Sequence, residues 1–246
     1  MAGLTLSIWL GVVGAVAGCF AGLVSLRLPV GDPVVRGRSA CGGCSRPLRP
    51  HQLVPLLSYA ASGGRCASCR SVIPVRYPLM ETGCALIGIW AAATQSSFVA
   101  AVLTALLGWQ LLLIAVVDGE HMWLPDSLTL PLGASGVLAA AVLPDMHVLD
   151  SLIGCALGLA SLWGLAEIHR KVRGTDGLGG GDPFLLATCG AWVGWAALPI
   201  VVLVAATSGL ALVSGRALAG GGFSRMDRIP FGPLLALGTW VAWNLR

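Results

Sequence analysis

The chain has 246 residues, of which 56% are hydrophobic, 11% charged and 7% aromatic, and its mean hydropathy is +0.84. Soluble domains carry roughly 25% charged residues, so the composition excludes an ordinary soluble protein, and a net charge of +4 is too small to indicate a nucleic-acid partner. The 34 glycines form no Gly-x-y repeat, which excludes collagen, and the apolar content excludes intrinsic disorder. The composition therefore predicts an all-α polytopic membrane protein in contact with the lipid bilayer.

Eight apolar runs approach the length of about 20 residues that a membrane-spanning helix needs. The first, residues 4–26, is followed by Arg27 and has no basic residue before it, whereas a cleaved signal peptide would begin with basic residues. We therefore expect a retained helix, on one face of which Gly14, Gly18 and Gly22 allow close helix packing. The other runs are residues 79–96, 98–117, 127–144, 149–167, 184–199, 200–215 and 230–245, with Pro199 as the marked break in the 184–215 pair.

The basic residues are unevenly distributed between the predicted loops. With about eight transmembrane helices, 14 of the 15 lysines and arginines lie on one side of the membrane, and only Arg246 lies on the other. Because basic residues concentrate in cytoplasmic loops, this side is predicted to face the cytoplasm, with both termini outside.

Residues 27–78 form an insert of a different kind, rich in Pro, Gly, Cys and Arg and without a 20-residue apolar run. The insert contains two Cys-x-x-Cys motifs, Cys41/Cys44 and Cys66/Cys69, separated by 21 residues. Two such motifs can bring four thiolates onto one tetrahedral Zn²⁺. The alternatives are two disulfides or unused thiols, but persistent disulfides are rare in a reducing compartment. We predict a small cytoplasmic zinc-knuckle insert with a structural metal, because four protein ligands leave no open position for catalysis.

Two aspartates lie at the predicted cytoplasmic ends of apolar runs. Asp118 ends one run in the string VDGEHMWLPDSLTLP, and Asp182 begins another in GLGGGDPFLLATCGAWVGW. An acid at the edge of a hydrophobic helix is costly without a function, and two carboxylates sharing one proton can hydrolyse a peptide bond. Glycines such as Gly179 and Gly181 would let a substrate backbone approach Asp182 closely.

Structural roles are the alternative for these acids. Asp182 could cap its helix, with Pro183 at the first helical position, and capping is the predicted role of Asp126. Glu120 and His121 are expected in a short solvated loop. The GLGGG string does not indicate a dinucleotide-binding loop, since no strand precedes it and Asp182 occupies the position of the third glycine.

Taken together, these strings resemble the type IV prepilin peptidases, which are bifunctional leader peptidases and N-methyltransferases. The string GCFAGLVSLRLP resembles the family's opening helix, and CGGC…CASC followed by RYPLMETG resembles its cytoplasmic zinc-bearing domain. The string around Asp118 is similar to the segment that holds the first catalytic aspartate, and GLGGGD is similar to the GxGD signature, in which Asp182 is the second. One departure is Phe184, which stands where family members usually have a lysine.

The resemblance implies a domain organisation and a function. It implies a first transmembrane helix (1–26), a zinc-binding insert with four cysteine ligands (27–78) and a transmembrane aspartyl peptidase domain (79–246). The implied enzyme cleaves prepilins or type II secretion pseudopilins at the cytoplasmic face of the bacterial inner membrane, and methylates the new N-terminus with S-adenosylmethionine, for which no residue is identified. The alternative is a non-catalytic assembly factor or transporter, although a transport site is expected near the membrane midplane and not at helix ends.

Overall fold

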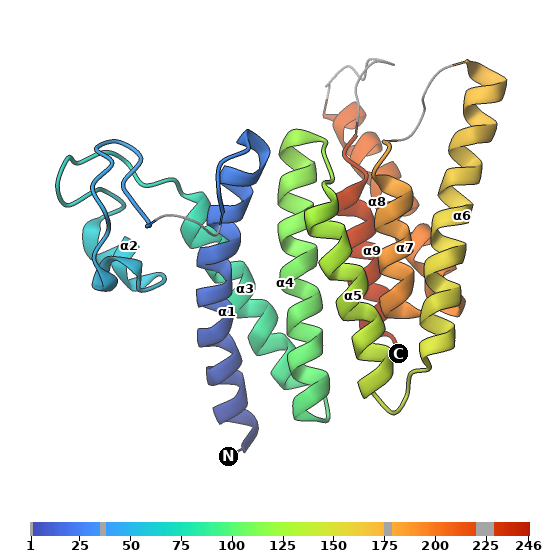
Figure 1. Ribbon diagram of the computed structural model, residues 1–246, viewed down its shortest axis with the longest axis horizontal. Helices are drawn as coiled ribbons and strands as arrows, with labels where there is room; N and C mark the ends of the chain where they lie inside the picture. Colours follow the sequence, from blue (N-terminus) through green and yellow to red (C-terminus); the bar gives the residue numbers. More distant parts are fainter. Residues whose placement is uncertain (1, 35–37, 175–178, 220–228) are drawn as a thin grey trace. The chain divides into compact units, whose positions relative to one another are not determined.

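The computed structural model describes residues 2–34, 38–174, 179–219 and 229–246. Within these ranges the regular structure is helical, and the strand-like pairings are two isolated bridges in the insert (Figure 1). The chain divides into two compact units, residues 1–109 and 110–246, with the boundary inside α4 (Phe98–His121). The all-α prediction is confirmed for the described residues.

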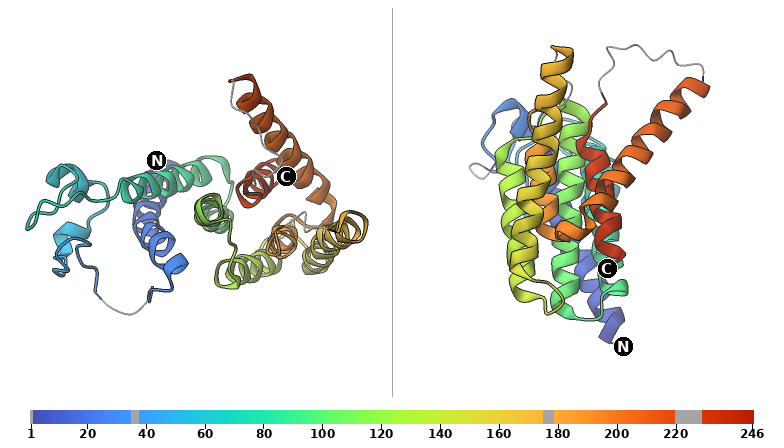
Figure 2. Two further views of the ribbon diagram at one scale, coloured as in Figure 1. Left: turned by 90° about the horizontal axis from the view of Figure 1, so that it is seen from above. Right: turned by 90° about the vertical axis from the view of Figure 1, so that its right-hand side faces the viewer.

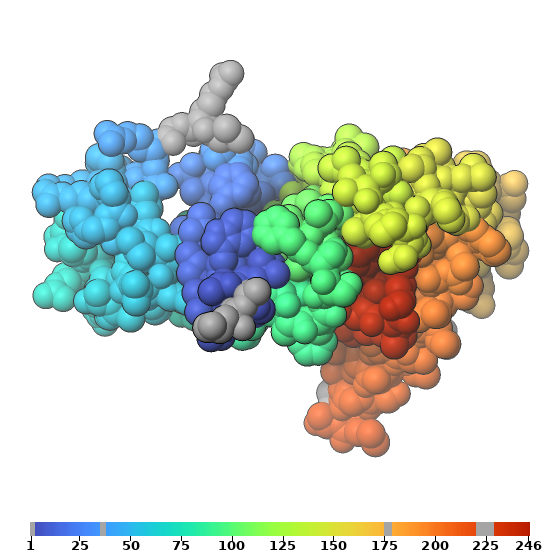
Figure 3. Space-filling model, turned by 90° about the horizontal axis from the view of Figure 1, so that it is seen from below, coloured from blue at the N-terminus to red at the C-terminus, as the bar shows by residue number. Residues whose placement is uncertain are grey.

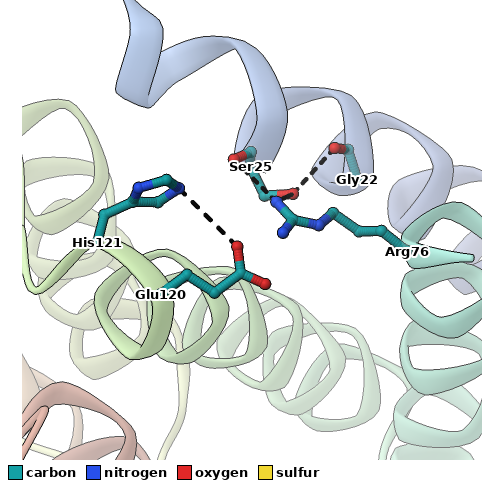
Figure 4. Close-up of polar contacts among 5 residues, drawn as sticks. All are labelled: Gly22, Ser25, Arg76, Glu120 and His121. Carbon is teal, nitrogen blue, oxygen red and sulfur yellow. Dashed lines mark hydrogen bonds and ion pairs between the residues drawn. The ribbon is translucent and has the colours of Figure 1, made fainter. Parts of the chain in front are cut away.

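The first unit is built on the close pairing of α1 (Ala2–Arg27) with α3 (Arg76–Thr94). A Cβ added to Gly14 would collide with the carbonyl oxygen of Cys84, and one added to Gly18 would lie 2.6 Å from the Cα of Glu81. The two backbones therefore touch through these glycines, which confirms their predicted packing role. At the end of this pair, the Arg76 guanidinium donates to the Ser25 carbonyl at 3.2 Å and to its hydroxyl at 3.4 Å (Figure 4).

The insert connects α1 to α3 with little regular structure. Its described residues form two short 3-10 helices, Leu28–Val30 and Pro50–Leu53, and one short α-helix, α2 (Leu57–Ser62). Each Cys-x-x-Cys motif lies in a tight turn closed by one of the isolated bridges, Ala40 with Pro47 and Arg65 with Val72.

The second unit is arranged around α7 (Asp182–Val193), a short helix in which every side chain except that of Phe184 is buried. Its partners are α5 (Asp126–Val142), α6 (Val148–Arg173), α8 (Leu198–Leu218) and α9 (Gly232–Asn244) (Figure 2, left). The end of α9, in red, lies between the yellow α5–α6 segment and the orange α7–α8 segment (Figure 3).

Glycines also bring α6 and α7 into backbone contact. A Cβ on Gly190 would collide with the carbonyl oxygen of Gly154, and one on Gly158 would lie 2.6 Å from that of Leu186. Such close approach lets a short helix be enclosed on all sides by its neighbours.

The chain is a multi-pass membrane protein, and among the described residues four helical segments are long and apolar enough to cross a bilayer. These are Gly3–Val30, Phe98–His121, Val148–Arg173 and Trp195–Leu218. The helices α3, α5, α7 and α9 also coincide with predicted spans but fall outside this set, so the count of about eight transmembrane helices stays a prediction.

The predicted break at Pro199 was wrong. The helix α7 ends at Val193, and Gly194 then takes a φ of 75°, a left-handed conformation that favours glycine. Pro199 lies in the first turn of α8, where its missing N–H costs no helical hydrogen bond.

Candidate functional site

Asp118 lies in the last turn of α4 and is only 5% exposed. Its Oδ2 accepts a hydrogen bond of 2.8 Å from the backbone N–H of Gly232, the first residue of α9, which lies 114 positions further along the chain. The helix that positions the acid and the helix that holds its carboxylate are therefore different elements.

Asp182 is the first residue of α7 and is 6% exposed. Its Oδ2 accepts a hydrogen bond of 3.1 Å from the backbone N–H of Gly179, and its own N–H donates to the Gly179 carbonyl. The helix cap is Gly181, and no side chain caps the helix, so the alternative in which Asp182 is merely a helix cap was wrong. Asp182 itself takes the first helical position expected for Pro183, and Pro183 is the second residue of the helix.

Asp118 and Asp182 are both buried residues of the second unit, and the negative charge of Asp118 acts on Asp182. In the segment before Asp182, Gly179 and Gly180 are exposed, whereas a Cβ on Gly181 would lie 2.8 Å from the Cβ of Leu124. Two buried carboxylates in one unit are groups that can serve acid–base hydrolysis, in which one carboxyl group is ionised and the other is protonated.

Neighbouring acids have different surroundings. Asp126 follows the cap residue Pro125 and makes no capping hydrogen bond, so its predicted capping role was wrong. It lies in the first turn of α5, where a negative charge interacts favourably with the helix dipole. Glu120 and His121 were predicted in a loop but form the exposed end of α4, where His121 Nε2 and Glu120 Oε2 are 3.8 Å apart (Figure 4).

The four cysteines of the insert converge in the first unit. The sulfur atoms of Cys41, Cys44, Cys66 and Cys69 all lie within 4.8 Å of one another, and none of the four forms a disulfide. The Sγ atoms of Cys41 and Cys69 are 3.7 Å apart, close to the roughly 3.8 Å between thiolates bound tetrahedrally to Zn²⁺ at about 2.3 Å.

The two turns that carry the cysteines repeat the same backbone at an offset of 25 residues. The Cys41 N–H donates to the carbonyl of Arg46, and that of Cys66 donates to the carbonyl of Ser71. Hydrogen bonds to Cys41 Sγ, first from the Ser71 hydroxyl at 3.3 Å and then from the backbone N–H groups of Gly43 and Cys44, lower the pKa of the Cys41 thiol to about 6. The thiolate is the form that binds metals, so the donor set and its surroundings fit a divalent metal such as zinc.

Gly232 is the site residue that the sequence reasoning missed. Its run is recognisable in the sequence only by hydrophobicity, yet a Cβ at this position would lie 2.6 Å from Asp118 Oδ2. The Phe-Gly-Pro string at residues 231–233 could have indicated where the last helix begins, because Gly-Pro commonly marks a break in the chain before a new helix.

Fold and site together define a class: multi-pass membrane proteins that bury a pair of carboxylates at helix ends. Residues 12–95 match the bacterial Peptidase A24 N-terminal domain, and residues 105–214 match the type IV leader peptidase family. The chain belongs to the type IV leader peptidase family. The second match contains Asp118 and Asp182 but ends before α9.

Several curated relatives carry the name prepilin leader peptidase/N-methyltransferase. The relative from Pseudomonas putida is 34% identical over 94% of this chain and 88% of its own length. Those from Pseudomonas aeruginosa and Burkholderia pseudomallei are 38% and 36% identical, over 85% and 92% of this chain and 72% and 81% of their own lengths. The comparison with solved structures gave no significant match.

Proposed function

We propose that this chain is a membrane-embedded aspartic endopeptidase that removes the leader of type IV prepilins or type II secretion pseudopilins. We place the reaction at the cytoplasmic face of the bacterial inner membrane, where most of the chain's basic residues are predicted to lie. The observation that carries the proposal is the pair of buried carboxylates, Asp118 and Asp182, each held by a glycine N–H. Family membership and the names of the relatives support the substrate class.

In the proposed reaction one carboxylate is ionised and the other is protonated. The ionised group takes a proton from water, the water oxygen attacks the scissile carbonyl carbon, and the protonated group donates its proton to the carbonyl oxygen. The ionised carboxylate then takes a hydroxyl proton from the tetrahedral intermediate. The C–N bond breaks as the protonated carboxyl group gives its proton to the departing amine. The pair returns to its starting state with one proton. Gly179 is exposed and has no side chain, which leaves room for the substrate backbone beside Asp182, whereas Gly181 packs against Leu124.

Two further parts of the proposal concern the insert and the second activity. We propose that Cys41, Cys44, Cys66 and Cys69 bind a structural zinc ion, which would hold the two turns together. The name of the relatives also supports N-methylation of the new N-terminus. S-adenosylmethionine supplies a methyl group in that reaction, and no residue of this chain is assigned to it.

The competing function is that of a non-catalytic assembly factor or transporter. Intramembrane acids in transporters line a path near the midplane, whereas Asp118 and Asp182 lie in the last turn of one helix and at the first residue of another. Their position therefore favours the peptidase.

The test is co-expression of the protein, or its variants, with a prepilin, followed by mass spectrometry of the pilin. Asp118→Asn and Asp182→Asn keep the side-chain shape but remove the charge, and each should reduce cleavage by about 10³-fold or more. Asp126→Asn is the matched control and should keep most activity, because Asp126 is exposed and the hydrogen bonds to the two buried carboxylates come from Gly232 and Gly179. The same spectra show whether the mature N-terminus carries an added methyl group.

Full cleavage by either Asp118→Asn or Asp182→Asn would refute the carboxylate pair. An inactive Asp126→Asn beside an active Asp118→Asn would instead identify Asp126 as the partner of Asp182.

A further inference from the structure

The insert has a basic pocket that the proposed peptidase reaction does not use. A cavity of about 260 Å³ is bounded on one side by Cys41 and Cys66 of the cysteine cluster and elsewhere by Arg46, Arg49, Gln52 and Ser68, among others. The Arg46 guanidinium is oriented by a hydrogen bond of 3.1 Å to the Ser68 hydroxyl. The pocket therefore presents several N–H and O–H donors to any group that enters it.

The charge of the insert is strongly positive. Residues 27–78 contain eight arginines, no lysine and a single acid, Asp32. A zinc ion bound by four thiolates would contribute a charge of about −2, which does not offset the arginines. The pocket thus favours an anion, and two guanidinium groups suit the oxygens of a phosphate.

Exposed apolar side chains follow the pocket residues in the chain. Leu53 and Val54 follow Gln52 in the chain and are exposed, and Leu57 at the start of α2 is 70% exposed. Exposed apolar side chains next to basic residues are typical of protein surfaces that lie on a membrane.

A hydrogen bond fixes the level of this segment along the transmembrane helices. The N–H of Leu56 donates to Glu81 Oε2 at 2.8 Å, and Glu81 is a buried residue of α3. Glu81 lies against Gly18 of α1, nine residues before the helix ends at Arg27. At about 1.5 Å per residue this level is roughly 13 Å inside the end of α1. Figure 1 accordingly shows α2 beside α1 and not beyond its end.

From these observations we infer that the pocket binds the phosphate headgroup of an anionic phospholipid, while Leu53, Val54 and Leu57 enter the boundary between the lipid headgroups and the acyl chains. The insert is then held at the membrane surface by a bound lipid on one side and by Glu81 on the other. This inference does not depend on the peptidase assignment, since it concerns only the first unit.

The test is hydrogen–deuterium exchange of the full-length protein in nanodiscs of phosphatidylcholine, with and without phosphatidylglycerol. Amides of residues 46–62 should exchange more slowly with phosphatidylglycerol present. The double variant Arg46→Gln/Arg49→Gln should lose this protection, by about fivefold for each arginine removed. The matched control, Arg65→Gln/Arg70→Gln, removes the same charge from exposed positions of the insert that do not line the pocket. It should retain the protection.

Three results would overturn the inference. Equal exchange in the two lipid compositions would show that no anionic lipid binds, and equal loss of protection in both double variants would show only diffuse charge attraction. If inorganic phosphate added to phosphatidylcholine nanodiscs gives the same protection, the occupant is a free anion and not a lipid. Unchanged exchange in α1 and α3 verifies that the variants are folded.

Discussion

The hydrogen bond from Gly232 to Asp118 yields the sharpest prediction about the proposed active site. In Gly232→Ala, the added Cβ would lie 2.6 Å from Asp118 Oδ2 and 2.9 Å from its Cγ. Carbon and oxygen cannot approach so closely, so the carboxylate must turn away from the N–H that now binds it at 2.8 Å. A hydrogen bond to a charged group contributes about 1.5–3 kcal/mol, so we expect prepilin cleavage to slow by about 10- to 100-fold.

The assay is the rate of leader cleavage by purified protein, compared with its thermal stability. Gly238→Ala in the same helix is the matched control, because its Cβ would collide with the Val201 carbonyl and disturb α9 without touching Asp118. Gly215→Ala in α8, which meets no atom within 4 Å, should change neither property much. Wild-type cleavage by folded Gly232→Ala, or an equal loss of cleavage in Gly238→Ala at equal stability, would refute the role given to this contact.

Two further predictions concern the metal and the packing. Purified protein should contain about one zinc ion per chain by elemental analysis. Cys66→Ser should lower both the zinc content and the melting temperature, whereas Cys155→Ser in α6 should leave the zinc content unchanged. A metal-free wild-type protein of full stability would contradict the zinc site. Gly190→Ala should destabilise the protein by about 1–3 kcal/mol, measured by thermal unfolding, because its Cβ would collide with the Gly154 carbonyl. Gly164→Ala is the control on α6: its Cβ would meet open space, so the stability of the protein should rise or stay unchanged.

Local chemistry made much of this molecule predictable. Long apolar runs specify helices because a bilayer offers backbone groups no other partners, and Gly14 and Gly18 indicated helix packing by their spacing alone. The Cys-x-x-Cys motifs indicated a cluster because their short turns constrain where each pair of sulfurs can lie. Asp118 and Asp182 attracted attention because a carboxylate at the edge of an apolar run is costly; both are buried, and their catalytic role stays a prediction.

Other features depend on contacts between distant segments, which no local pattern encodes. The N–H of Gly232 reaches Asp118 only because α9 packs in the second unit, and Glu81 reaches Leu56 only because the insert folds back along α3. The end of α7 was misplaced for a related reason. Proline is a stronger local signal than glycine, but Gly194 adopts the positive φ that turns the chain, and Pro199 begins the next helix.

The hydrogen bond between α9 and α4 also has a consequence for the order of synthesis. Asp118 leaves the ribosome long before Gly232, so a nascent chain contains both proposed catalytic acids while one of them still lacks its backbone donor. The site reaches its final geometry only when α9 joins the second unit. On the proposed assignment, proteolytic competence therefore arrives late, and a chain that stops or inserts incompletely before α9 carries two aspartates without an organised active site.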